Sequence, residues 1–167
     1  MNGGVPLRAK YAATLFLKGV LLLMTVGMIA LYVFGLPEMA ATEAAQDPET
    51  AYLQYPFLIV AYIFFSPILI AFYQTFKLLG YIGRDQAFSD SVLKALTVIK
   101  YCALAIIFFI VLGELAAILF IDDDITHIIT LGVIGTLASA AVAVFADLLR
   151  SLLKDAIAMK SSNDLIV

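Results

Sequence analysis

Four apolar segments of membrane-spanning length constrain the fold of this chain more than any other feature. A hydrocarbon core about 30 Å thick requires about 20 helical residues. The segments at residues 14–36, 56–76, 101–121 and 126–146 meet that length. The chain is 63% hydrophobic and 14% charged, whereas soluble domains average about 25% charged residues. We therefore expect an all-α fold, a four-helix transmembrane bundle, with residues 1–167 forming a single membrane domain.

The basic residues predict how the chain sits in the membrane. None of the ten Lys and Arg residues lies in the links 37–55 and 122–125, whose charged residues are all acidic. Because cytoplasmic loops are enriched in Lys and Arg, we expect these two links to lie outside the cell. Both termini and the loop 77–100 are then cytoplasmic. Lys18 falls inside the first span, and its long side chain is expected to reach the inner interface.

The third and fourth helices are expected to extend beyond the membrane into the cytosol. Ser89 is placed to cap a helix over residues 90–100. Residues 147–160 carry apolar side chains at helical spacing and belong to a cytosolic tail over residues 147–167. Both extensions are amphipathic, so we expect them to pack on each other beneath the bilayer.

Two residues inside the spans are candidates for a functional role. Glu114 is the one acidic residue well inside a span, and intramembrane acids mark functional sites by default. The alternative is a neutral Glu114 hydrogen-bonded to Thr130, which should lie at similar depth. Pro67 follows Ser66 in the second span and should kink that helix, because it lacks a backbone donor. Kinked helices build transporter sites, but they also occur in purely structural bundles.

The fourth span is rich in small residues at close spacing: Gly132, Gly135, Ser139 and Ala143. In lipid, such residues allow two helices to approach closely. They can form the contact of a homo-oligomer or pack against other helices of the same chain. We favour packing within the chain.

A cluster of polar residues joins the third span to the fourth. Asp122, Asp123 and Asp124 lie close to His127, and carboxylate oxygens with one imidazole suit several divalent cations. The simpler interpretation is that Asp124 caps the fourth helix and that the acids mark the outer side of the membrane. We expect no bound metal and no cofactor.

The residues needed for catalysis are missing from the sequence. It has no metalloprotease, phosphate-loop or nucleophile-elbow motif. The one cysteine, Cys102, and the one histidine, His127, belong to opposite leaflets in the predicted topology. We therefore expect that the protein is not an enzyme.

The predicted cytosolic face carries bases, an aromatic residue and an apolar tail. One interpretation is that the bases have no role beyond setting the topology and contacting anionic lipid headgroups. The tail, Leu165–Ile166–Val167, follows a polar leader, which suggests that it docks either onto this chain or onto another protein. Direct binding to nucleic acid is not expected so close to anionic lipid. The residues expected to contact a protein partner are Phe88, Lys94, Lys100, Lys160, Asn163, Asp164 and Leu165.

Several of these residues also carry a family resemblance. One set runs from Lys77–Leu78–Leu79 through Phe88 to Ile99–Lys100–Tyr101, and the other from Ala143–Val144–Phe145–Ala146 to Asn163–Asp164–Leu165. Together they resemble the domain-of-unknown-function 2975 family, the YoaS-like small four-helix bacterial membrane proteins. This chain differs at Ser161–Ser162, where an acidic residue is commoner in that family.

The resemblance implies a regulatory function. Members of that family are often encoded beside a very small helix-turn-helix regulator, and the family has no established activity to carry over. We therefore expect a non-enzymatic protein of the bacterial cytoplasmic (inner) membrane that sequesters a small helix-turn-helix transcription factor. The alternative is an oligomeric small-solute or ion transporter or channel component, with Glu114 and Pro67 lining its path. A third possibility is a structural membrane protein with no defined ligand.

Overall fold

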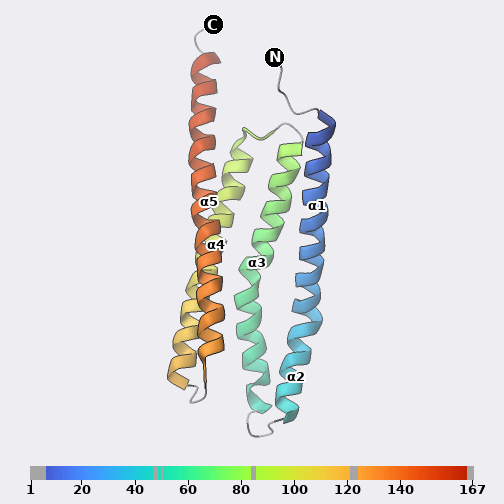
Figure 1. Ribbon diagram of the computed structural model, residues 1–167, viewed down its shortest axis with the longest axis vertical. Helices are drawn as coiled ribbons and strands as arrows, with labels where there is room; N and C mark the ends of the chain where they lie inside the picture. Colours follow the sequence, from blue (N-terminus) through green and yellow to red (C-terminus); the bar gives the residue numbers. More distant parts are fainter. Residues whose placement is uncertain (1–6, 47–48, 50, 84–85, 121–123, 165–167) are drawn as a thin grey trace. The chain divides into compact units, whose positions relative to one another are not determined.

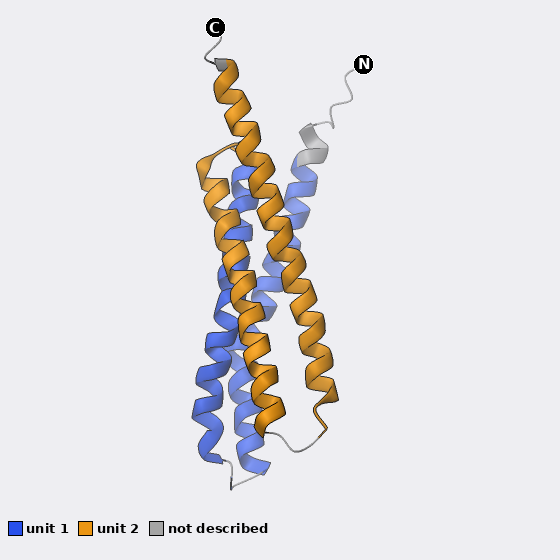
Figure 2. Cartoon of the chain, turned by 90° about the vertical axis from the view of Figure 1, so that its left-hand side faces the viewer, with its two compact units in different colours: residues 1–83 blue, residues 84–167 orange. Residues whose placement is uncertain are grey.

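The computed structural model describes residues 7–46, 49, 51–83, 86–120 and 124–164, and within these ranges the regular structure is entirely helical (Figure 1). This confirms the predicted all-α fold. The described residues include 4 helices long and apolar enough to cross a membrane. The chain divides into two compact units, unit 1 at Met1–Gly83 and unit 2 at Arg84–Val167 (Figure 2).

Unit 1 is a helical hairpin whose first arm is nearly twice the length of a membrane span. This arm comprises α1 (Leu7–Ala30), the π-helix η1 (Leu31–Gly35) and α2 (Leu36–Gln46). They follow one another without a break. The candidate membrane span within this arm runs from Tyr11 to Gln46 and has 36 residues. At 1.5 Å per residue this helix is about 54 Å long. The 3-10 turn η2 (Ala51–Leu53) leads into the second arm, α3 (Gln54–Gly83).

The π-helix has a local cause in the sequence, the proline that follows it. The Leu36 N–H donates to the Leu31 carbonyl, the i to i−5 pattern that widens a helix. Pro37 follows directly, and a proline ring collides with the carbonyl four residues earlier in a regular α-helix. We infer that the wider turn relieves this collision. At Gly35 an added Cβ would lie 2.7 Å from Leu31 Cδ1, so the Leu31 side chain would have to move to admit a larger residue.

The helices of unit 1 extend well past the predicted spans. Residues 37–55 were expected to be an outer loop, but α2 continues through them to Gln46. This part of the prediction is wrong for a physical reason. Residues 39–46 are rich in Ala and contain Glu and Gln, which are good helix formers, and a helix can continue where the apolar segment ends. In the same way α3 runs on to Gly83, into the predicted inner loop 77–100.

Unit 2 is a second hairpin, made of α4 (Asp90–Phe120) and α5 (Thr126–Asp164). The two helices run antiparallel and pack along their length (Figure 1). The buried residues of these two helices are mostly small, with a few larger apolar ones. These are Val92, Ala95, Leu96, Ile99, Cys102, Ala103 and Ala117 on α4, and Ala143 and Ala146 on α5.

Both helices of unit 2 begin where their capping residues predict. The N–H groups of Val92 and Leu93 donate to the Ser89 carbonyl at 3.0 and 3.3 Å, which places Ser89 at the start of α4. Its side-chain Oγ is buried and has no hydrogen-bond partner among the described residues, so Ser89 caps through its backbone alone. At the start of α5, Asp124 Oδ1 accepts a hydrogen bond from the Thr126 N–H at 2.9 Å.

The predicted extensions of the third and fourth helices are helical. Residues 90–100 belong to α4, and residues 147–160 belong to α5, which continues to Asp164. In the α4 extension Val92, Ala95, Leu96 and Ile99 are buried, whereas residues 147–160 of α5 are exposed or half-buried. The cytosolic location of these extensions, like that of both termini, stays a prediction.

Candidate functional site

Glu114 of α4 lies directly against Gly132 of α5. A Cβ added at Gly132 would lie 2.7 Å from Glu114 Cδ and would collide with Glu114 Oε1. The carboxyl therefore occupies the space that any side chain at position 132 would fill. Glu114 Oε1 is buried and has no hydrogen-bond partner among the described residues. We call the Glu114 carboxyl and the Gly132 backbone on which it rests the carboxyl seat.

The alternative expectation for Glu114, a hydrogen bond with Thr130, is wrong. The Thr130 hydroxyl donates instead to the Thr126 carbonyl of its own helix at 2.7 Å. A helical threonine can always find this acceptor four residues earlier, so Thr130 needs no partner on α4. The Glu114 oxygen is left without a donor.

The other small residues of α5 lie along the same contact. A Cβ at Gly135 would lie 3.0 Å from Ile110 Cδ1 of α4. Ala143 is buried, and Ser139 is half-buried. The structure thus places Gly132 and Gly135 against a helix of the same chain. Whether α5 also takes part in a homo-oligomer stays a prediction.

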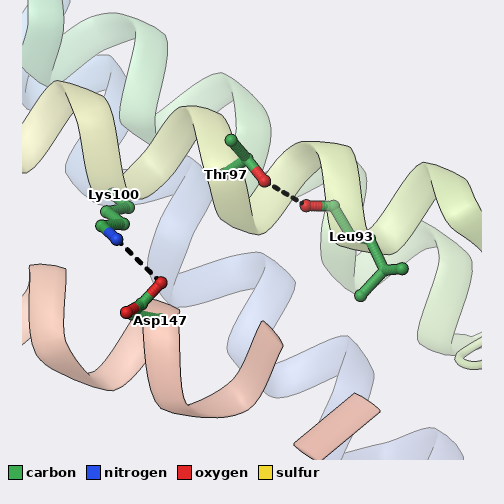
Figure 3. A network of polar contacts seen from close by, with 4 residues as sticks. All are labelled: Leu93, Thr97, Lys100 and Asp147. Carbon is green, nitrogen blue, oxygen red and sulfur yellow. Dashed lines mark hydrogen bonds and ion pairs between the residues drawn. The ribbon is translucent and has the colours of Figure 1, made fainter. Parts of the chain in front are cut away.

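Farther from the α4–α5 turn, an ion pair joins the two helices. Lys100 Nζ of α4 lies 2.8 Å from Asp147 Oδ1 of α5 (Figure 3). One turn earlier on α4, the Thr97 hydroxyl donates to the Leu93 carbonyl at 2.8 Å (Figure 3). Lys100 was expected to contact a protein partner, but its ammonium group already pairs with Asp147 of the same chain.

Of the other residues expected to contact a protein partner, four have side chains that the structure describes, and all four are exposed. Phe88 is 59% exposed, and Lys94, Lys160 and Asn163 are also exposed. Asp164 ends α5. The side chain of Asp164 and all of Leu165 lie outside the described part of the chain. The exposed residues all belong to unit 2, at the end that carries Lys100. We call this the basic end of unit 2.

Asp124 and His127 are arranged for helix capping. The hydrogen bonds from Thr126, helped by the nearby His127, hold the pKa of Asp124 below its ordinary value. His127 is exposed on the first turn of α5. Asp122 and Asp123 lie outside the described residues, and the described residues contain no group of three potential metal ligands.

Unit 1 contains a polar contact that sequence reasoning missed. The rings of Tyr32, in η1, and Tyr62, in α3, are 4.6 Å apart at 48°. The Tyr62 carbonyl accepts hydrogen bonds from the Ser66 hydroxyl at 2.6 Å and, more weakly, from the Tyr32 hydroxyl at 3.5 Å. Ser66 directly precedes Pro67, and α3 stays helical on both sides of that proline. No signal in the sequence pairs Tyr32 with Tyr62.

Unit 1 also places Lys18 at the end of a helix. A Cβ at Gly83 would lie 3.8 Å from Lys18 Nζ, so the ammonium group of α1 lies beside the last residue of α3. Free carbonyls give a helix C-terminus a partial negative charge. Lys18 therefore lies in a favourable electrostatic environment at the end of α3, and its position at the inner membrane interface stays a prediction.

Comparison with known proteins identifies the family. A family model described as a protein of unknown function, DUF2975, matches residues 38–167. The chain belongs to the DUF2975 family. The uncharacterized membrane protein YoaS of Bacillus subtilis (strain 168) is 42% identical over 156 residues, which cover 93% of this chain and 98% of YoaS. No solved structure matches the chain.

These comparisons confirm the family resemblance and the class of protein. The chain is a member of a membrane protein family, and neither the family description nor the name of the relative indicates an enzyme. The DUF2975 match begins in α2 and includes all of α3, α4 and α5. The carboxyl seat, the Lys100–Asp147 pair and Tyr62 lie within it, whereas Tyr32 precedes it.

Proposed function

We propose that this DUF2975 protein is a non-enzymatic regulatory protein of the bacterial cytoplasmic membrane. It holds a small helix-turn-helix transcription factor at the membrane and releases it in response to a membrane or extracellular signal. Both termini and the basic end of unit 2 face the cytoplasm in this proposal, as the distribution of Lys and Arg predicts.

One observation carries this proposal. At 39 residues, α5 is about 58 Å long, whereas the hydrocarbon core is about 30 Å thick. The part of α5 beyond the predicted span still exposes large apolar side chains, including Leu152 at 61% and Met159 at 66%. Exposed apolar groups cost nothing in lipid, but in water a contiguous apolar patch marks a contact with another molecule.

The surroundings of these apolar groups suit a protein partner. Lys94, Lys154 and Lys160 are exposed at the same end of unit 2, and Phe88 adds an exposed aromatic ring. Lys100 contributes indirectly, since its ion pair with Asp147 holds α4 and α5 together. The proposed contact therefore centres on the exposed residues Phe88, Lys94, Leu152, Met159, Lys160 and Asn163.

A pull-down at native expression level in mild detergent tests the proposal. We expect the full chain to recover a small DNA-binding protein, and a chain ending at Lys160 to recover less of it. Replacing Leu152 and Met159 with Ala should reduce recovery. The matched control replaces Leu131 and Leu137, which are exposed on the same helix within the predicted span, and should leave recovery unchanged. If none of these chains recovers a DNA-binding protein, the regulatory proposal is wrong.

The second candidate function, an oligomeric small-solute or ion transporter or channel component, is favoured by the unpartnered oxygen of Glu114. This function requires oligomerisation, because the four membrane-length helices of one chain are too few to enclose most transport paths. Gly132 and Gly135 already contact α4, so an oligomer would have to use another face of α5. In reconstituted vesicles, Glu114→Gln should then abolish solute or ion flux. Flux that is absent or unchanged excludes this candidate.

A further inference from the structure

We propose that one exposed face of α5, beyond its ion pair with α4, docks a single helix of a soluble protein, and that this helix carries a Lys or Arg opposite Asp155. We call this face the α5 seam, and it consists of Leu148, Leu152, Asp155 and Met159. The inference deepens the proposed function and rests on it in one respect, since both place the end of α5 in the aqueous phase inside the cell. It adds the shape and the charge of the partner.

The residues of the α5 seam follow one another at the spacing of a coiled coil. Successive members are separated by steps of four, three and four residues, which place them on one face of a helix. Leu148 is 55% exposed, Leu152 61% and Met159 66%, and Asp155 is exposed as well. A second helix can therefore pack along this face.

The ion pair between Lys100 and Asp147 marks where the two helices leave the apolar phase. Over residues 90–100 the exposed residues of α4 are all polar, whereas over residues 101–120 none of the exposed residues is charged. The polar surface of α4 therefore begins at Lys100. Because Lys100 pairs with Asp147, Asp147 marks the same level on α5.

Most of the α5 seam lies past this level. Measured along α5 from Asp147, Leu152 is about 8 Å away and Met159 is about 18 Å away. The headgroup layer adds only about 5–8 Å on each side of the hydrocarbon core, so the seam extends about 10 Å beyond the headgroups. Large apolar side chains exposed there face water, and such a surface marks a contact with another molecule.

Asp155 argues against a second copy of this chain as that molecule. Two copies in one membrane have the same orientation, so their α5 helices would pair in parallel and bring the two Asp155 carboxylates together. Like charges at a desolvated contact are unfavourable. Asp155 also finds no base on its own helix, because the residues three and four positions away are Ser151, Leu152, Ala158 and Met159. The base must come from a different protein.

The α5 seam thus specifies both the charge and the length of its partner. Apolar side chains would face the three apolar residues, and one Lys or Arg would face Asp155, because a charge buried at a contact requires a partner of opposite sign. From Leu148 to Met159 the seam is about 17 Å long. Helices of globular proteins average about 10–14 residues, or about 15–21 Å. One helix of ordinary length therefore covers the seam.

Photocross-linking of the full chain in intact cells, at native expression level, tests the inference. The photoreactive residue p-benzoylphenylalanine replaces one residue at a time, and peptide mass spectrometry identifies the products. We expect positions 152 and 159 to form a product with the same soluble protein. Two exposed control positions should form no product with that protein. They are Lys154, which lies off the seam, and Ile134, which lies within the predicted span.

A charge reversal then tests the role of Asp155. With the photoreactive residue at position 152, Asp155→Lys should lower the yield of this product at least about tenfold, because it places two bases against each other. The matched control is Lys154→Glu, a charge reversal at the neighbouring exposed position off the seam, and it should leave the yield unchanged. Replacing the facing base of the captured protein with Glu should restore the yield with Asp155→Lys.

Three results would overturn the proposal. One is a product of twice the chain mass at position 152, which would identify a second copy as the occupant. Another is the lack of any protein product at both seam positions. The third is an equal yield in Asp155→Lys and the wild type. Charge-dependent capture of a soluble protein that does not bind DNA would support the α5 seam and refute the regulatory function proposed above, so the two proposals can fail separately.

Discussion

Lys100 of α4 and Asp147 of α5 form an ion pair at 2.8 Å, immediately beyond the predicted third and fourth spans. They are 47 residues apart in the sequence. Their side chains are 31% and 49% exposed, so water competes for both groups and screens their attraction. The pair aligns the two helices of unit 2 more than it stabilises them.

Breaking this pair should therefore have a small effect. We expect Asp147→Asn and Lys100→Met each to lower the thermal unfolding temperature in detergent only slightly, and the double variant to lose less than the sum of the single variants. Lys94→Ala, at an exposed position on the same helix, is the control and should behave like the wild type. Fully additive losses would mean that Lys100 and Asp147 do not interact in solution.

The contact at Gly135 should resist a larger side chain. Its Cβ would lie 3.0 Å from Ile110 Cδ1, and overpacking of this kind costs about 1–3 kcal/mol. Both variants gain the helix preference of Ala, so we expect Gly135→Ala to be less stable than Gly113→Ala by about the overpacking cost, near the lower end of that range. Gly113→Ala, which meets nothing within 4 Å, should be neutral or stabilising, because Ala favours helices over Gly by about 1 kcal/mol. Equal stability of the two variants, measured by reversible unfolding in micelles, would contradict the packing at Gly135.

The ring of Tyr32 should matter more than its hydroxyl. The hydrogen bond from its hydroxyl to the Tyr62 carbonyl is long, at 3.5 Å, whereas the two rings are 4.6 Å apart. Aromatic pairs contribute about 0.5–1.5 kcal/mol beyond the area that they bury. We expect Tyr32→Phe to be close to the wild type and Tyr32→Leu to be destabilised by about 1 kcal/mol. Tyr73→Leu, at a 65% exposed position of α3, is the control. A loss in Tyr32→Phe as large as that in Tyr32→Leu would show that the hydroxyl is the important group.

Asp124 should make the start of α5 sensitive to acid. Its pKa is lowered in the folded protein, chiefly by the hydrogen bonds from Thr126. The stabilisation is therefore complete above the unfolded value of about 3.9 and is lost as the pH falls through the lower folded value. Hydrogen exchange of the first-turn amides of α5 should speed up over that acidic range in the wild type. In Asp124→Ala, these amides should already exchange faster at neutral pH, without an added acid step. An acid step of the same size in Asp124→Ala would assign the effect to another carboxyl.

Features that depend on local chemistry could be predicted from the sequence. The four apolar segments predicted the membrane-length helices, because the hydrophobic length of a helix must match the bilayer. Ser89 and Asp124 marked the starts of α4 and α5, because a helix start needs an acceptor beside its free N–H groups. The helical extensions at 90–100 and 147–160 followed from the spacing of apolar side chains.

The contacts between residues far apart in the chain became visible only in the folded protein. The small residues of α5 predicted that another helix approaches α5 closely. They did not identify Glu114 and Ile110 as the neighbours of Gly132 and Gly135. The π-helix at Leu31–Gly35 and the pairing of Tyr32 with Tyr62 were also hidden. In lipid, hydrophobicity does not distinguish one helix face from another, so the register between two helices depends on the fit of side chains far apart in the sequence.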